Sequence, residues 1–352
     1  MSFARQGRLV GFELFVLRLS GRSVLTSKNN EKTKNCSVFL RKVVTDFSEN
    51  RRMKSQHLNF FLAMAEHGSI RGAARALGLT QPAVTKTVRT LEKEVGLPLI
   101  QRSISGVVLT EHGQALLKHA QRINNEMRRA EEAMAARKDG QGGVVRAAVS
   151  ASAAITLLPA ALEEFTRRLP RARVTLIESS LKSSLNGLFD GSLDLAVLQL
   201  GPGDFPPHIQ TVPLFDVAQR IVVRKGHAHQ HATSFGELTD CKWVVPQHPD
   251  WRGVFSSPNF WPDSLPLPAT LIECSSLVIA QSMVQSADFV SIFPEPSIRV
   301  AGLAANIVPV NVVEPLPSLR MSIIYNADTA ATDASDTFMA CVKAAAKVTK
   351  VG

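Results

Sequence analysis

Apolar side chains in residues 69–96 recur at intervals of three and four, which predicts two short helices separated by a tight turn. Ser69 and Thr80 are suitable N-caps for these helices, and Gly78 can end the first one. Pro82 falls in the first turn of the second helix, where its missing N–H does no harm. The pattern therefore predicts a helix-turn-helix.

The pattern changes after the second predicted helix. Residues 99–102 and 107–109 have the character of two short strands around the turn Ser103–Gly106. Two strands that follow a helix-turn-helix indicate a β-wing, and such a hairpin would place Arg102 beside the backbone of a bound duplex.

The face of the second helix opposite its apolar stripe is polar and cationic. Gln81 and Thr85 are suited to base edges, and Lys86 and Arg89 to phosphates. An Ala-rich helix pair with exposed cations is also common as a plain solvated surface, and the wing favours DNA binding over that alternative. The candidate DNA-binding residues are Gln81, Pro82, Thr85, Lys86, Arg89 and Arg102.

Residues 110–137 contain no proline and favour a long helix. Six apolar residues are spaced 4, 3, 4, 3 and 4 apart, as in the a/d positions of a coiled coil. A helix packed on its own domain can show the same spacing, but a dimer would supply a second recognition helix for a partly symmetric site. The predicted dimerisation residues are Leu116, Ala120, Ile123, Met127, Ala130 and Met134. The glycine-rich stretch Asp139–Gly143 is expected to be a flexible hinge.

Beyond Gly143 strands alternate with helices, which predicts βαβ units and parallel sheets. Strands are expected at 144–149, 173–178, 193–198, 220–223, 243–245, 289–293 and 319–325, with helices at 155–168, 181–190, 276–286 and 332–348.

Ligands of open α/β sheets bind beyond the carboxyl ends of strands. This rule selects Ser150, Ser152, Gln199, Pro246 and Gln247 as candidate effector-binding residues. Hydroxyls and free N–H groups at the start of a helix suit a small anion, such as a carboxylate or a sulfonate. The alternative is that Ser150 and Ser152 only cap the helix that begins near Ala153.

The net charge of +10 is unevenly distributed. Residues 1–52 contain 11 Lys and Arg against 4 Asp and Glu, and residues 53–137 contain 12 against 7. Residues 138–352, in contrast, contain 17 against 19. The positive charge accompanies the predicted helix-turn-helix, as contact with a polyanion requires.

Several other classes of protein are disfavoured. No apolar run reaches the roughly 18 residues that span a bilayer, so no membrane partner is expected. The cysteines are far apart, which fits free thiols in a reducing cytoplasm. His227, His229 and His231 alternate, but they are more typical of a polar turn than of a metal site. Because no catalytic motif appears, we expect no enzyme activity, metal or cofactor.

Residues 53–137 resemble the N-terminal domain of LysR-type transcriptional regulators. The family pattern appears in Gly68-Ser69, Ala73-Ala74, Thr80-Gln-Pro-Ala83, Thr85-Lys86, Leu91-Glu92, Gly96-Leu-Pro-Leu-Ile-Gln-Arg102 and Leu109-Thr-Glu-His-Gly113. Ile100 stands where the family usually has Phe, and it keeps an apolar anchor.

The resemblance implies a multidomain α and α/β protein: a winged helix-turn-helix, a long linker helix, and a two-lobed effector domain of the type 2 periplasmic-binding-protein kind. It also implies a homodimer or homotetramer that binds double-stranded promoter DNA and responds to a small-molecule effector through movement of the lobes. In the family, the positions that match the candidate effector-binding residues hold the effector. A solute-binding protein for transport is the alternative, but it leaves the helix-turn-helix unexplained.

The expected divisions of the chain follow from this resemblance. Residues 1–52 lie outside it and are expected to be disordered or to result from a misassigned start. The other expected segments are 53–110 (DNA binding), 111–138 (linker and dimerisation) and 139–352 (effector binding), with lobe I at about 144–215 and 318–352 and lobe II at about 216–317.

Overall fold

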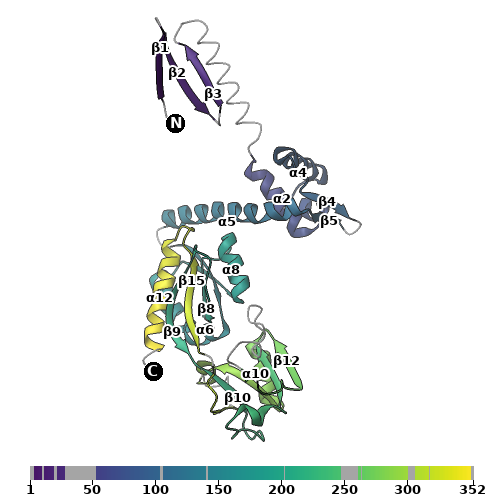
Figure 1. Ribbon diagram of the computed structural model, residues 1–352, viewed down its shortest axis with the longest axis vertical. Coiled ribbons are helices and arrows are strands. Elements are labelled where there is room, and N and C mark those ends of the chain that lie inside the picture. The colour runs from purple at the N-terminus through teal and green to yellow at the C-terminus, as the bar shows by residue number, and fades with distance from the viewer. Residues whose placement is uncertain are drawn as a thin grey trace. The chain divides into compact units, whose positions relative to one another are not determined.

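The computed structural model (Figure 1) describes residues 4–9, 12–19, 22–27, 53–103, 106–139, 142–201, 203–246, 261–262, 264–299, 306–316 and 318–349. The chain divides into two compact units, an N-terminal unit Met1–Ala120 and a C-terminal unit Gln121–Gly352. Within the described ranges, no helix is both long and apolar enough to span a membrane.

Three strands lie in the segment that we expected to be disordered or misassigned. β1 (Ala4–Leu9), β2 (Phe12–Leu19) and β3 (Arg22–Ser27) form an antiparallel sheet in chain order. β2 is rich in apolar residues, including aromatic and β-branched ones that favour strands. Residues 28–52 lie outside the described part of the chain.

The helix-turn-helix consists of α2 (Ser55–His67), α3 (Ile70–Ala76) and α4 (Gln81–Val95). The Ser69 hydroxyl accepts a hydrogen bond from the Gly72 N–H at 3.0 Å, which is the predicted cap. Thr80 is the N-cap of α4, but its side chain makes no cap hydrogen bond. The three helices enclose a core that includes Met64, Ala73, Ala74, Val84 and Val88.

The wing is the hairpin of β4 (Ile100–Ser103) and β5 (Gly106–Leu109), with Ile100 opposite Leu109. Two contacts attach it to the helices. The Glu92 carboxylate accepts hydrogen bonds from the Leu99 and Ile100 N–H groups at 2.9 and 3.2 Å. On the other strand, the Val107 N–H donates to the Gly68 carbonyl at 2.8 Å.

α5 (Glu111–Asp139) is the predicted long helix. The Thr110 hydroxyl accepts from the Gly113 N–H at 3.0 Å and so caps it. Its residues 111–120 belong to the N-terminal unit and its residues 121–139 to the C-terminal unit.

The first sheet of the C-terminal unit has the order β7-β6-β8-β15-β9. β6 is parallel to β7 and β8, whereas β15 is antiparallel to β8 and β9. The strands are β6 (Val144–Val149), β7 (Arg173–Glu178), β8 (Leu195–Leu200), β9 (Ile209–Val217) and β15 (Leu319–Asn326). The helices of this half are α6 (Ala151–Thr156), α7 (Leu158–Arg168), α8 (Leu181–Asp190) and α12 (Asp333–Thr349).

The second sheet has the order β12-β11-β13-β10-β14. A cluster of three aromatic rings lies in its core: Phe235 stacks with Trp243, and Trp261 packs edge-to-face against both. Its strands are β10 (Gln219–Arg224), β11 (Lys242–Pro246), β12 (Thr270–Cys274), β13 (Phe289–Pro294) and β14 (Ile307–Val310). Its helical segments are η1 (Phe235–Leu238), α10 (Leu277–Ser286) and α11 (Glu295–Arg299).

The predicted fold class is confirmed: a helix-turn-helix precedes an α/β domain with two sheets. Three details differ. The helix expected at 155–168 is two helices, α6 and α7, which meet at Leu157 just before Pro159. β9 was not anticipated as a strand, and neither were β12 and β14.

Candidate functional site

A groove of about 880 Å³ lies on the helix-turn-helix. It contains five of the six candidate DNA-binding residues, which the fold thus brings together on one surface. The lining residues are Ile70, Gln81, Pro82, Thr85, Lys86, Arg89, Thr90 and Lys93.

The helical periodicity of α4 places its groove residues on the face opposite the core. Val84, Val88 and Leu91 are fully buried, so the opposite face of the helix is presented to solvent. The Thr90 hydroxyl donates to the Lys86 carbonyl at 2.9 Å and is used within the helix. No such hydrogen bond of the Thr85 hydroxyl is found in the described part of the chain, which leaves it available to a partner.

Lys93 is a groove residue that the sequence reasoning missed. It lies four residues after Arg89 and seven after Lys86, so the helical period that selected those two cations would have found it. The three cations form a row along α4. Arg102 is in β4 opposite Val107, and its side chain lies outside the described residues.

The candidate effector site lies where β6 and β8 end. The Ser150 hydroxyl accepts from the Ala153 N–H at 3.2 Å, so Ser150 does cap α6 as the alternative had it. Ser152 is different. Its side chain is 2% exposed, and its hydroxyl has no hydrogen-bond partner among the described residues.

Gln199, near the end of β8, has a buried amide nitrogen that also lacks a partner in the described ranges. Buried polar groups in proteins are nearly always hydrogen-bonded, and leaving one unpaired costs about 1–3 kcal/mol. Two unpartnered donors, one just beyond the end of β6 and the other near the end of the adjacent parallel strand β8, therefore indicate a place for a polar ligand.

Two further residues of this kind come from the second half of the C-terminal unit. Ser297 of α11 and Gln219 of β10 are buried, and each has a polar side-chain atom without a partner in the part of the chain that is described. α11 packs against α6, the helix that contains Ser152. The carboxyl-end rule could have found Ser297, because α11 directly follows β13.

The second-lobe candidates are only partly described. Pro246 ends β11, and nothing is described of its side chain. Gln247 lies outside the described residues.

The structure divides the predicted dimerisation residues into two groups. Ala120 is fully buried and Leu116 partly buried in the core of the N-terminal unit with Leu58, Phe61 and Leu91, and their part in dimerisation stays a prediction. Four seam residues, in contrast, are exposed on α5: Ile123, Met127, Ala130 and Met134.

Comparison with known proteins identifies both the helix-turn-helix and the C-terminal domain. Residues 55–114 match the bacterial regulatory helix-turn-helix protein model of the lysR family, and residues 138–347 match the LysR substrate binding domain. The chain belongs to the LysR family of transcriptional regulators. The family accounts for a DNA-binding helix-turn-helix joined to a substrate-binding domain in one chain.

Individual LysR-family proteins are similar over most of this regulator. The HTH-type transcriptional regulator TdcA of Escherichia coli is 27% identical over 275 residues, which are 78% of this chain and 87% of TdcA. The crystal structure of CbnR superposes with a TM-score of 0.61 at 21% identity and covers 84% of this chain and 99% of CbnR. Full-length CbnR complexed with its target DNA has the same TM-score, with 83% of this chain and 100% of that chain covered.

Proposed function

We propose that this LysR-family regulator binds promoter DNA through the α4 groove and that a small anionic effector in the C-terminal unit modulates this binding. The single observation that supports the effector site best is the buried, unpartnered Ser152 hydroxyl. The transport alternative is disfavoured because residues 55–114 match a regulatory helix-turn-helix.

On the DNA side, Gln81 and Thr85 read base edges while Lys86, Arg89 and Lys93 contact phosphates, joined by Arg102 from the wing. The groove supports this division, because amide and hydroxyl groups lie beside a row of cations. CbnR, which has the same fold, has a structure with its target DNA.

Fluorescence anisotropy with the DNA upstream of this chain's own gene tests the DNA proposal. We expect Lys86→Ala to weaken binding to all sequences and to reduce the slope of log K against log salt by about 1. Gln81→Ala is expected to lower the preference for the upstream site over random DNA. Lys118→Ala, an exposed lysine outside the groove, is the control, and equal effects of all three variants would reject the assignment.

On the effector side, the Ser152 hydroxyl and the Gln199 amide donate hydrogen bonds to a carboxylate or a sulfonate. Ser297 and Gln219 approach from the other sheet, so a ligand that satisfies both pairs would draw the two halves together.

Calorimetry of the full-length chain with a panel of small carboxylates and sulfonates tests this site. Ser152→Ala should weaken binding of any hit by about tenfold, since a hydrogen bond to a charged group contributes about 1.5 kcal/mol or more. Ser184→Ala is the matched control, because that serine is equally buried and unpartnered but belongs to α8. Equal loss in both variants, or none with Ser152→Ala, would place the effector elsewhere.

We further propose that Ile123, Met127, Ala130 and Met134 pair α5 with the α5 of a second copy, as a homodimer or within a homotetramer. Three of these side chains are 41–56% exposed although they are large and apolar. Their spacing of four, three and four residues is that of a coiled-coil seam.

A further inference from the structure

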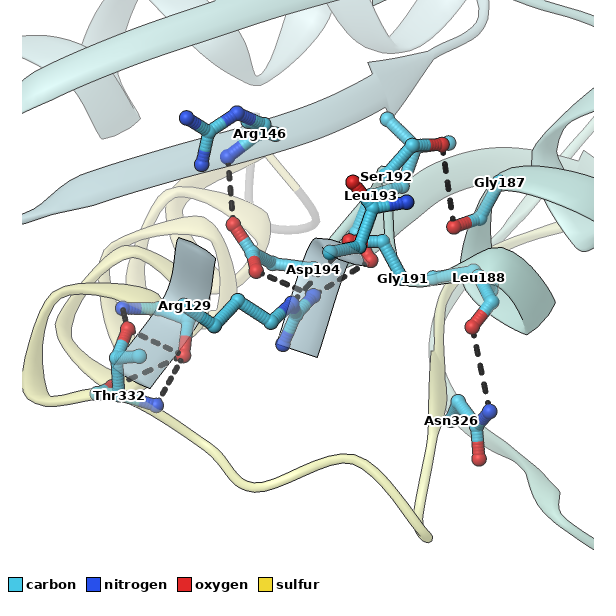
Figure 2. A network of polar contacts seen from close by, with 12 residues as sticks. Arg129, Arg146, Gly187, Leu188, Gly191, Ser192, Leu193, Asp194, Asn326 and Thr332 are labelled. Atoms are coloured by element: carbon cyan, nitrogen blue, oxygen red, sulfur yellow. Dashed lines mark hydrogen bonds and ion pairs between the residues drawn. The ribbon is translucent and has the colours of Figure 1, made fainter. Parts of the chain in front are cut away.

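The buried guanidinium of Arg129, on α5, attaches residues 121–139 of that helix to the first sheet (Figure 2). Arg129 Nη2 lies 2.6 Å from Asp194 Oδ1, and the two side chains are only 7% and 6% exposed. The same guanidinium donates to the Gly191 carbonyl at 3.2 Å and to the Leu193 carbonyl at 2.8 Å.

These carbonyls lie at and just beyond the C-terminal end of α8. Gly191 ends that helix in the left-handed conformation, with a φ of 75°. The last carbonyls of a helix lack partners within it and carry partial negative charge. Asn125 supplies another donor by bonding the Asp190 carbonyl at 2.7 Å. Residues of α5 therefore satisfy the end of α8 with a cation and an amide.

A second ion pair fixes α5 to β6. The Arg146 guanidinium, on β6, makes two hydrogen bonds of 2.7 and 2.9 Å to the Glu132 carboxylate, on α5. Arg128, one turn earlier on α5, also bonds Glu132 at 3.0 Å. The helix is thus held at two points along its length.

Asp194 connects Arg129 to both strands that end at the candidate effector site. It directly precedes β8, and its Oδ2 accepts from the Arg146 N–H of β6 at 2.7 Å (Figure 2). The Asp194 N–H in turn donates to the Arg146 carbonyl at 2.8 Å. Just beyond the carboxyl end of β6, the Ser150 N–H donates to the carbonyl of Val197 in β8 at 3.0 Å.

We propose that the Arg129–Asp194 pair couples the effector site to the linker helix, which makes Arg129 a positioning residue for regulation. This inference rests on the effector site proposed above. β6 and β8 carry Ser152 and Gln199 beyond or near their carboxyl ends, and their amino ends are fixed to α5. A shift of these strands therefore displaces α5 with them, because sliding the strands past the helix would leave a buried charge unpaired.

Reciprocity of coupling allows a test without a known effector, with operator DNA as the ligand. The probe is the duplex upstream of the gene, added to the full-length protein, and hydrogen exchange is followed by mass spectrometry. In the wild type, DNA binding should change the exchange of peptides that cover 148–154 and 196–201. In the double variant Arg129→Gln/Asp194→Asn this change should be lost while DNA is still bound.

The control is Glu164→Gln/Arg167→Gln, which removes the ion pairs of Glu164 with Arg167 and Arg168 on α7 and should leave the change intact. Asn125→Ala, which keeps the buried charges paired, should reduce the change in part and replaces the double variant if that protein does not fold. The coupling is overturned if the exchange changes persist in full in these α5 variants. It is also overturned if the wild type binds DNA but shows no exchange change in these peptides. Failure of the wild type to bind the duplex instead refutes the proposed function.

Discussion

Gly106 illustrates how a single residue determines the position of the wing. Its φ is +134°, and a Cβ built on it would lie 2.4 Å from the Gly68 carbonyl oxygen. The next residue, Val107, bonds that same carbonyl. The wing can thus approach the turn before α3 this closely only because position 106 has no side chain.

Gly106→Ala is expected to destabilise the N-terminal unit by about 1–3 kcal/mol, through backbone strain and the clash with Gly68. DNA affinity should fall with it, because the wing moves. Thermal unfolding and anisotropy with the upstream duplex measure the two effects. Gly203→Ala, where a Cβ meets open space, should change neither, and a stable, fully binding Gly106→Ala protein would contradict this account.

Arg129 shows the energetics of a buried charge. Arg129→Met alone should destabilise the C-terminal unit by about 3–5 kcal/mol, because Asp194 is left unpaired. Arg129→Met/Asp194→Leu should recover most of that loss, since it removes both charges. Urea unfolding of the two proteins is the measurement. A double variant as unstable as the single one would show that packing, rather than the unpaired charge, dominates.

At the scale of elements, α5 has two chemically different faces. Asn125, Arg129 and Glu132 are used by α8, β6 and the start of β8, whereas Met127 and Met134 are exposed. The helix therefore cannot turn its apolar seam inward without breaking the polar contacts on its other face. This arrangement favours a second copy as the partner of the seam.

Met127→Glu is expected to shift the protein toward monomers, because a carboxylate would be placed in an apolar seam. Analytical ultracentrifugation over a range of protein concentrations measures the shift. Val348→Glu is the control, since Val348 is 76% exposed on α12. Unchanged association of Met127→Glu would remove α5 from the dimer interface.

Acid should loosen the attachment of α5. Hydrogen bonds from Arg146 lower the pKa of Glu132 from its ordinary value. Burial of the carboxyl group acts in the opposite direction but is the weaker effect. A lowered pKa contributes stability that is complete above the unfolded-state value of about 4.3 and is lost as pH falls through the folded-state value. Unfolding free energies between pH 6 and pH 3.5 should therefore fall more steeply for the wild type than for Glu132→Gln, and parallel curves would contradict this.

At the scale of the whole molecule, the N-terminal part of the chain is basic and the remainder slightly acidic. Residues 1–52 alone contain 11 Lys and Arg, although the family match begins only at residue 55. We propose that these charges contact DNA without regard to its sequence, in addition to the residues of the α4 groove.

Removal of residues 1–52 should lower affinity for random DNA and its salt dependence, while the preference for the upstream site is kept or increased. Competition anisotropy at several salt concentrations measures both quantities. Loss of site preference on truncation would show instead that this segment takes part in recognition.

Local patterns were sufficient to predict the helix-turn-helix, the wing and α5. Ser69 caps α3 and Gly78 follows it as predicted, because caps and turns depend on neighbours within a few residues. β12 and β14 were missed because each is short and at an edge of a sheet, where pairing with β11 or β10 defines the strand more than its own pattern does. The packing of α11, which contains Ser297, against α6 had no local signal either, because the two helices are far apart in the chain.

The sequence by itself determined the family, the polar face of α4 and most of the helices and strands, because these depend on periodicity and short motifs. Only the tertiary structure decided which apolar residues of α5 are free, which serine lacks a partner, and where Arg129 goes. Arg129 and Asp194 are far apart in the chain, and neither has a local signal for the other. Their pairing exists because folding places both out of water, where each charge requires the other.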